Sequence, residues 1–128
     1  MSIDDRPIIR VAVPSEPPGG LDSARSGRFS RSPNFTIVDL VDGSVVDVTV
    51  VANEPHGHGG HLSPVLTLGE RQVDVVIVAG IGKRVLLSCL QAGLRVLAGE
   101  DRPDVRSVID AFVDADLSPV GSDATLLH

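Results

Sequence analysis

Aromatic residues and cysteine are scarce in this sequence of 128 residues, which contains no Trp, no Tyr, three Phe and one Cys. A single cysteine cannot form an intramolecular disulfide. The shortage of aromatic rings removes the stacking surfaces with which proteins bind single-stranded nucleic acids. The net charge of −6 repels phosphate backbones. These features exclude general nucleic-acid binding, and we expect no nucleic acid among the partners.

Long apolar runs are also missing. No stretch approaches the roughly 20 residues that a helix needs to span a bilayer. The first ten residues, MSIDDRPIIR, carry acidic side chains and lack the apolar core of a signal peptide. We therefore expect a cytoplasmic protein without a membrane partner.

The apolar residues that are present are mainly Val, Leu, Ile and Ala. This mixture is typical of α/β proteins, because β-branched side chains favour strands whereas Leu and Ala favour helices. The length suits one domain, which we place over residues 1–117, followed by a loosely structured tail over 118–128. Apolar periodicity and turn residues predict strands over 8–13, 35–41, 45–51, 73–79 and 94–98, and helices over 63–69, 83–92 and 103–115.

Two local patterns predict how the strands are connected. Asp42-Gly43 lies between two apolar strands and predicts a hairpin. Residues 73–98 predict a strand–helix–strand unit with parallel strands and a right-handed crossover. Together they predict an α/β fold with a five-stranded mixed sheet, in the spatial order 3-2-1-4-5, and helices on the faces of the sheet.

An arginine-bearing loop is the first of three segments with chemical potential. Residues 14–32 are rich in Gly, Pro and Ser and form a long loop, a feature that is often functional in compact domains. Arg25, Arg28 and Arg31 recur in it every three residues. Guanidinium groups are permanent donors for anions, so these side chains are candidates to hold an anionic ligand. The alternative is a solvated loop with incidental arginines.

A histidine segment is the second. His56, His58 and His61 lie within six residues and are interleaved with glycines. Histidine is a common metal ligand, which makes all three candidate metal ligands. No helical spacing, cysteine or carboxylate completes a closed tetrahedral zinc site. The open alternatives are imidazoles that contact a bound cluster, and a polar turn before the next helix.

The turn Gly80-Ile81-Gly82 is the third, and it precedes a predicted helix that begins with Lys83-Arg84. Backbone N–H groups and the positive end of a helix attract anions. Gly80 and Gly82 are therefore candidate binding residues. A bare GxG is a weak motif that lacks the other elements of a dinucleotide or phosphate loop, and tight strand-to-helix packing explains it equally well.

The predicted topology brings these segments together. Ligands of open α/β sheets bind at the carboxyl ends of strands, where connections diverge, and here that point lies between the first and fourth strands.

We predict Cys89 to be a core residue, because it lies on the apolar face of its helix. No serine lies in a nucleophile elbow and no carboxylate spacing indicates acid–base pairing, so the sequence favours a binding protein without catalytic residues over an enzyme.

Five stretches, taken in order, are similar to those of one known family. They are VAVPSE (11–16), GRFSRSPNFTIVD (27–39), HGHGGH (56–61), VDVVIVAGIG (73–82) and CLQAGLRVLAG (89–99). The chain resembles the dinitrogenase iron-molybdenum cofactor biosynthesis family, whose members have an RNase H-like mixed α/β fold. Members with an assigned role carry or store iron–sulfur cofactor precursors for nitrogenase.

The resemblance implies a ligand and partners. The ligand would be an anionic iron–sulfur or iron–molybdenum-type cofactor or its precursor, held by the arginines, histidines and glycines named above. The partners would be proteins that donate or accept this cofactor, and a homo-oligomer is a further expectation. The family commonly reads His-Phe-Gly-Arg where this chain has Arg28-Phe29-Ser30-Arg31, which replaces one potential metal ligand by a cation. Two alternatives stay open: a metal-free sensor of anions or nucleotides, and a protein-interaction module that dimerises through its hairpin edge.

Overall fold

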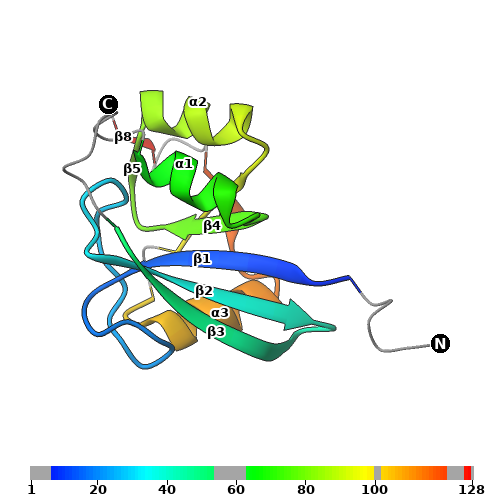
Figure 1. The fold of residues 1–128 in the computed structure, drawn as a ribbon. Coiled ribbons are helices and arrows are strands. Elements are labelled where there is room, and N and C mark those ends of the chain that lie inside the picture. Colours follow the sequence, from blue (N-terminus) through cyan, green and yellow to red (C-terminus); the bar gives the residue numbers. More distant parts are fainter. Residues whose placement is uncertain (1–6, 54–62, 100–101, 121–125, 128) are drawn as a thin grey trace.

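A six-stranded mixed sheet forms the centre of the protein, in the order β3-β2-β1-β4-β6-β7 (Figure 1). The structure is a computed structural model that describes residues 7–53, 63–99, 102–120 and 126–127. The strands of this sheet are β1 (Ile9–Ser15), β2 (Asn34–Val41), β3 (Ser44–Ala52), β4 (Val75–Val78), β6 (Arg95–Ala98) and β7 (Ser118–Pro119).

The order of the first five strands confirms the predicted topology. β1, β4 and β6 run parallel, while β2 is antiparallel to both β1 and β3. Asp42 and Gly43 form the hairpin turn, and both have positive φ values, of 52° and 81°. The sheet differs from the prediction by one strand, because β7 adds antiparallel to β6. Two residues without apolar alternation give no sequence signal for such a strand.

Helices cover both faces of the sheet (Figure 1). α1 (Ser63–Glu70) and α2 (Lys83–Gln91) pack on one face, and α3 (Val105–Val113) packs on the other. Alternation along the strands builds two cores, because successive side chains of a strand point to opposite faces. Ala12 of β1 contributes to the core beneath α1 and α2, whereas Val11 and Val13 contribute to the core beneath α3.

The predicted ends of α2 agree with the structure to within one residue. Gly93 has φ +88° directly after the helix, and Leu94 follows it, buried, with its N–H donating to the carbonyl oxygen of Cys89 at 3.0 Å. This is the hydrogen-bond pattern of a glycine-terminated helix. The start of α2 directly follows the turn formed by Gly80, Ile81 and Gly82.

The end of the chain contributes two short pairings. Besides β7, Leu126–Leu127 (β8) pairs in parallel with Ile81–Gly82 (β5). The turn before α2 therefore also contains a short strand. The division into a domain over 1–117 and a tail over 118–128 stays a prediction.

Candidate functional site

The segment between β1 and β2, residues 16–33, is here called the arginine loop, and buried polar side chains hold it on the sheet. The hydroxyls of Ser15 and Thr36 lie 2.8 Å apart, and the N–H of Gly20 donates to Thr36 Oγ1 at 3.0 Å. Ser32 is fully buried and donates to the carbonyl oxygen of Asn34 at 2.7 Å. Hydrogen bonds to buried polar groups fix local geometry, because breaking them leaves unsatisfied partners.

An aromatic contact anchors the same loop. The ring centroids of Phe29 and Phe35 lie 5.4 Å apart with an interplanar angle of 56°, a tilted arrangement that aromatic pairs favour. Phe29 is 4% exposed. It therefore ties the middle of the loop to the core beneath α1 and α2, while its neighbours Arg28 and Arg31 remain exposed.

Two adjoining pockets share the exposed part of the loop. The first, here called the glycine pocket, has a volume of about 260 Å³ and is lined by residues 27–31 and residues 80–82. The second, here called the glutamate pocket, has a volume of about 430 Å³ and is lined by Glu16, Ser26, Gly27, Arg28, Arg31 and Pro33. The two pockets have Gly27, Arg28 and Arg31 in common. The glycine pocket includes the turn that follows β4, and the glutamate pocket includes Glu16, which directly follows β1.

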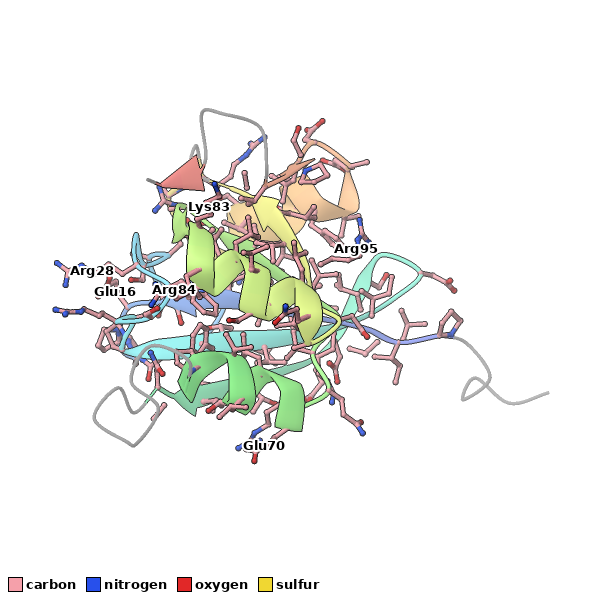
Figure 2. The ribbon with its side chains drawn as sticks, turned by 90° about the horizontal axis from the view of Figure 1, so that it is seen from above. Glu16, Arg28, Glu70, Lys83, Arg84 and Arg95 are labelled. Carbon is pink, nitrogen blue, oxygen red and sulfur yellow. The ribbon has the colours of Figure 1, made fainter. Side chains whose placement is uncertain are left out.

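Cationic side chains dominate this end of the molecule. Arg28 and Arg31 form no ion pair with any residue that the structure describes. Figure 2 shows Arg28, Glu16 and Arg84 at one end of the molecule, well separated from Arg95. The guanidinium groups thus have donors available for a ligand, in a protein whose net charge is −6.

The turn that completes the glycine pocket leads directly into α2. Gly82 is the N-cap of this helix, in an extended conformation with φ −70° and ψ 150°, and no side chain of the described residues caps the first turn. The helix start consequently presents backbone donors and a positive dipole end without a protein acceptor from a side chain.

The start of α3 is different, because the arginine loop itself covers it. The carbonyl oxygens of Ser23 and Leu21 accept from the N–H groups of Val105 and Arg106 at 3.0 and 2.8 Å. Asp104 caps the helix by accepting from the Ser107 N–H at 2.8 Å, which lowers the pKa of its carboxyl group. The α2 start differs in having no such loop over it among the described residues, although β5 directly before it pairs with β8.

The structure separates Arg25 from the other predicted site arginines. Its Nε donates to the carbonyl oxygen of Arg102 at 2.6 Å, and its backbone N–H donates to Pro103 at 3.1 Å. Arg25 lines neither pocket. It joins the arginine loop to the segment before α3. Of the predicted binding residues, the structure brings together Arg28, Arg31, Gly80 and Gly82.

The histidines lie outside the described residues. His56, His58 and His61 fall within 54–62, so their predicted role as metal ligands stays a prediction. Within the described part of the chain, no group of three or more His, Cys, Asp or Glu side chains is arranged to hold a metal ion.

Cys89 is fully buried, and its burial raises the pKa of the thiol to about 11. The prediction that it is a core residue is confirmed.

Sequence reasoning missed three residues of this region. Glu16 lines the glutamate pocket beside both arginines. Ser26 is buried, and its Oγ accepts from the Arg28 N–H at 3.2 Å. Asn53 holds the loop through its side-chain amide. The only hint in the sequence is position, since Glu16 and Asn53 each directly follow the end of a strand.

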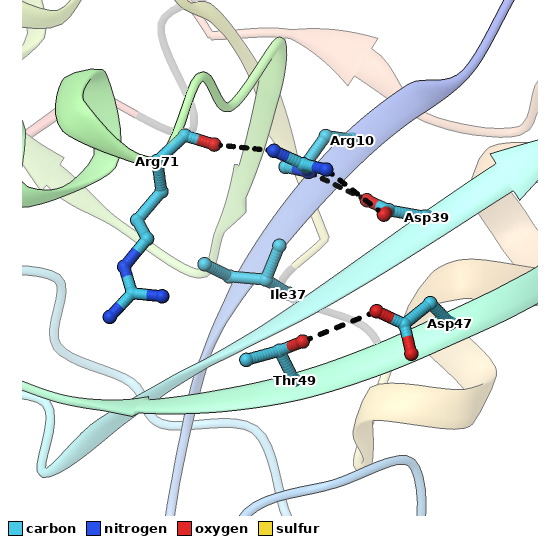
Figure 3. Close-up of a pocket in the computed structure, with 6 residues that line it drawn as sticks. All are labelled: Arg10, Ile37, Asp39, Asp47, Thr49 and Arg71. Atoms are coloured by element: carbon cyan, nitrogen blue, oxygen red, sulfur yellow. Dashed lines mark hydrogen bonds and ion pairs between the residues drawn. The ribbon is translucent and has the colours of Figure 1, made fainter.

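A third pocket, of about 140 Å³, lies near the amino end of β1 (Figure 3). Arg10 donates from Nε and Nη2 to the two carboxylate oxygens of Asp39, at 2.7 and 3.1 Å, and from Nη1 to the Arg71 carbonyl oxygen at 2.8 Å. This two-point pairing raises the pKa of Arg10. The donors of Arg10 are thus occupied by the protein itself, which gives this pocket a structural explanation.

Comparisons with known proteins agree with this architecture. The sequence profile of the dinitrogenase iron-molybdenum cofactor family matches residues 7–115. The NMR structure of the Thermotoga protein TM1290 is 30% identical, with a TM-score of 0.72, and the alignment covers 89% of this chain and 95% of that one. The apo form of the orange protein from Desulfovibrio gigas is 24% identical, with a TM-score of 0.77, and covers 88% of this chain and 92% of its own, which shows the shared fold. A search of curated proteins gave no match.

No helix within the described residues is long and apolar enough to cross a membrane.

Proposed function

Because the chain belongs to the dinitrogenase iron-molybdenum cofactor family, we propose that it binds and carries an anionic iron–sulfur or iron–molybdenum-type cofactor, or a precursor of one. The cluster is cargo, taken from a donor protein and passed to an acceptor, and the chain performs no chemistry on it. The expected setting is the cytoplasm, in a pathway related to nitrogen fixation.

One observation carries the proposal: two exposed arginines and the start of an uncapped helix line the same pocket. Arg28 and Arg31 come from the arginine loop, and Gly80 and Gly82 come from the turn before α2. The sulfide and thiolate groups of such a cluster give it negative charge and acceptor atoms. Guanidinium groups and backbone N–H groups are suitable donors for such an anion.

The remaining predicted residues have distinct roles in this proposal. We propose that His56, His58 and His61 supply imidazoles that bind the metal atoms of the cargo directly, because imidazole is a common metal ligand. Arg25 contributes indirectly by fixing the arginine loop to the segment before α3. Glu16 partly offsets the positive charge of the two arginines, because it lines the glutamate pocket together with them.

A second candidate function is the binding of a metal-free anion, such as a phosphate or a nucleotide. This candidate is favoured by the glycine pocket, whose guanidinium and backbone N–H groups bind anions and not metal ions. The two functions differ in whether the histidine segment takes part in binding.

Anaerobic reconstitution tests the proposal and separates the two candidates. The protein is mixed with a synthetic iron–sulfur cluster anion bearing thiolate ligands, desalted, and examined for iron content, visible absorption and EPR. We expect retained iron, and loss of most of it in a variant with His56, His58 and His61 all replaced by Ala. Absence of iron after desalting, or retention that the triple variant leaves unchanged, contradicts the carrier. Calorimetry with inorganic phosphate and ATP in metal-free buffer then tests the second candidate.

A further inference from the structure

Asn53 connects the end of β3 to the arginine loop through three hydrogen bonds. Its side-chain Nδ2 donates to the carbonyl oxygens of Ser30 and Ser32, at 3.1 and 2.8 Å, and its backbone N–H donates to the carbonyl oxygen of Pro33 at 3.0 Å. Asn53 is only 7% exposed. Both protons of the amide can therefore be used within the protein, at a site that largely excludes water.

The two side-chain bonds bracket Arg31. Ser30 and Ser32 are its chain neighbours, so holding both of their carbonyl oxygens restricts the backbone of Arg31 on either side. Because the peptide group is planar and trans, a Ser30 carbonyl directed at Asn53 turns the Arg31 N–H to the opposite side. The same contacts keep two carbonyl oxygens occupied by the protein, where they are not free to repel an anionic ligand.

We propose that Asn53 is a positioning residue that fixes Arg31, and with it the wall of both pockets, in the shape required for anion binding. The inference rests on the proposed function, to which it adds a residue that touches no ligand. Asn53 also lies three residues before His56 in the sequence.

The chemistry of the contact suggests a specific substitution. Asn53→Asp preserves size and shape, but an ionised carboxylate has no proton to donate and repels the two carbonyl oxygens. A protonated carboxyl group restores one donor. The variant should therefore bind anions weakly at high pH and recover part of its affinity as the pH falls, because burial beside two carbonyl oxygens favours the protonated carboxyl group.

The protein also offers a matched control. Asp39→Asn makes the reverse exchange of carboxylate and amide at another buried position, where it weakens the pairing with Arg10. Arg10 and Asp39 pair near the amino end of β1, whereas the pockets lie beyond its carboxyl end. Both variants disturb a buried polar contact, and only one of them disturbs the arginine loop.

Two measurements on the full chain test the inference. The first is anaerobic titration with the thiolate-ligated iron–sulfur cluster anion at pH 8 and pH 6, with wild type measured in parallel. We expect Asn53→Asp to lose on the order of tenfold in affinity at pH 8, which corresponds to the loss of one or two buried hydrogen bonds, and to recover part of this loss at pH 6. Asp39→Asn should bind within about twofold of wild type at both values.

The second measurement needs no ligand. Trypsin cleaves after arginine, so the rates of cleavage after Arg28 and Arg31 report how firmly the loop is held. We expect cleavage there to be on the order of tenfold faster in Asn53→Asp than in Asp39→Asn under native conditions. Equal cleavage rates in the two variants, or cluster affinity unchanged by Asn53→Asp, overturn the inference. Wild-type protein that binds no cluster contradicts the proposed function instead, while the cleavage comparison still decides whether Asn53 holds the loop.

Discussion

Arg28 and Gly82 are far apart in the sequence but line the same pocket at the carboxyl ends of β1 and β4. The parallel pairing of these two strands makes this possible, since both segments leave the sheet on the same side. A permanent cation and the start of a helix thereby face one cavity. Neither group alone forms a binding site, whereas the two together provide donors from two directions.

The arginines should account for most of the affinity for an anionic cargo. Replacing both Arg28 and Arg31 by Ala removes two charged donors, each worth about 1.5 kcal/mol or roughly tenfold in affinity. We expect the double variant to bind the cluster anion about 100-fold more weakly than wild type, as measured by anaerobic absorption titration. The wild-type affinity should also fall as salt is raised, because both side chains are exposed.

Arg95→Ala serves as the control for this experiment. Arg95 is an exposed arginine at the start of β6 and lies away from Arg28 in Figure 2. The single substitution changes the net charge by one without touching the pockets. Equal losses of affinity per arginine removed in the two variants would show that overall charge, and not the pocket, attracts the anion.

Gly82→Ser should separate folding from binding. A Cβ at Gly82 meets no protein atom within 4 Å, and its φ of −70° suits any residue. Serine is a better N-cap than glycine by a few tenths of a kcal/mol, so thermal stability should rise slightly. The added hydroxymethyl group competes for the donors at the start of α2, and we expect cluster affinity to fall by about tenfold. Unchanged affinity in a stably folded variant would exclude the helix start from the binding site.

The ion pair of Arg10 and Asp39 should matter for stability alone. The Asp39 side chain is 12% exposed and that of Arg10 is 33% exposed, so the pair is only partly screened by water. Asp39→Asn leaves a guanidinium without its charged partner, at a cost of about 1–3 kcal/mol. Urea unfolding of wild type and variant measures this difference. A midpoint equal to that of wild type contradicts the structural role assigned to this pocket.

The buried thiol of Cys89 predicts a loss of stability in alkali. Burial raises the pKa of the folded thiol from its ordinary value of 9.0 to about 11, so the folded protein keeps a proton that the unfolded chain releases. This contribution is intact below pH 9 and disappears as the pH rises toward 11. Near pH 10 the stability already lost amounts to about 1 kcal/mol. The stability difference between wild type and Cys89→Ala, measured by urea unfolding at pH 8 and pH 10, should shrink accordingly, and a constant difference contradicts it.

Local patterns in the sequence predict most of the fold. The apolar run that contains Val75–Val78 identifies a strand covered on both faces, and its four residues are buried. Gly93 identifies the end of α2 because a positive φ is required there. β7 gave no such signal, because Ser118 and Pro119 are polar or conformationally restricted and pair with β6 only through the tertiary fold.

The candidate site was only partly accessible to the same reasoning. Arg28 and Arg31 could be selected because cations in an acidic chain are conspicuous. Arg25 shares their spacing, yet the antiparallel bridge between Ser15 and Arg25 directs it toward Arg102. For Asn53 the sequence gives only its position after a strand, since its partners are backbone carbonyl oxygens that any sequence supplies.

The most direct test of the carrier proposal is the composition of the protein isolated without oxygen from the cells that naturally produce it. Iron and acid-labile sulfide are measured together with visible absorption. We predict coloured protein with both elements in a fixed ratio to the chain, and their loss when Arg28 and Arg31 are replaced by Ala. Colourless protein free of iron, molybdenum and sulfide would contradict the proposal.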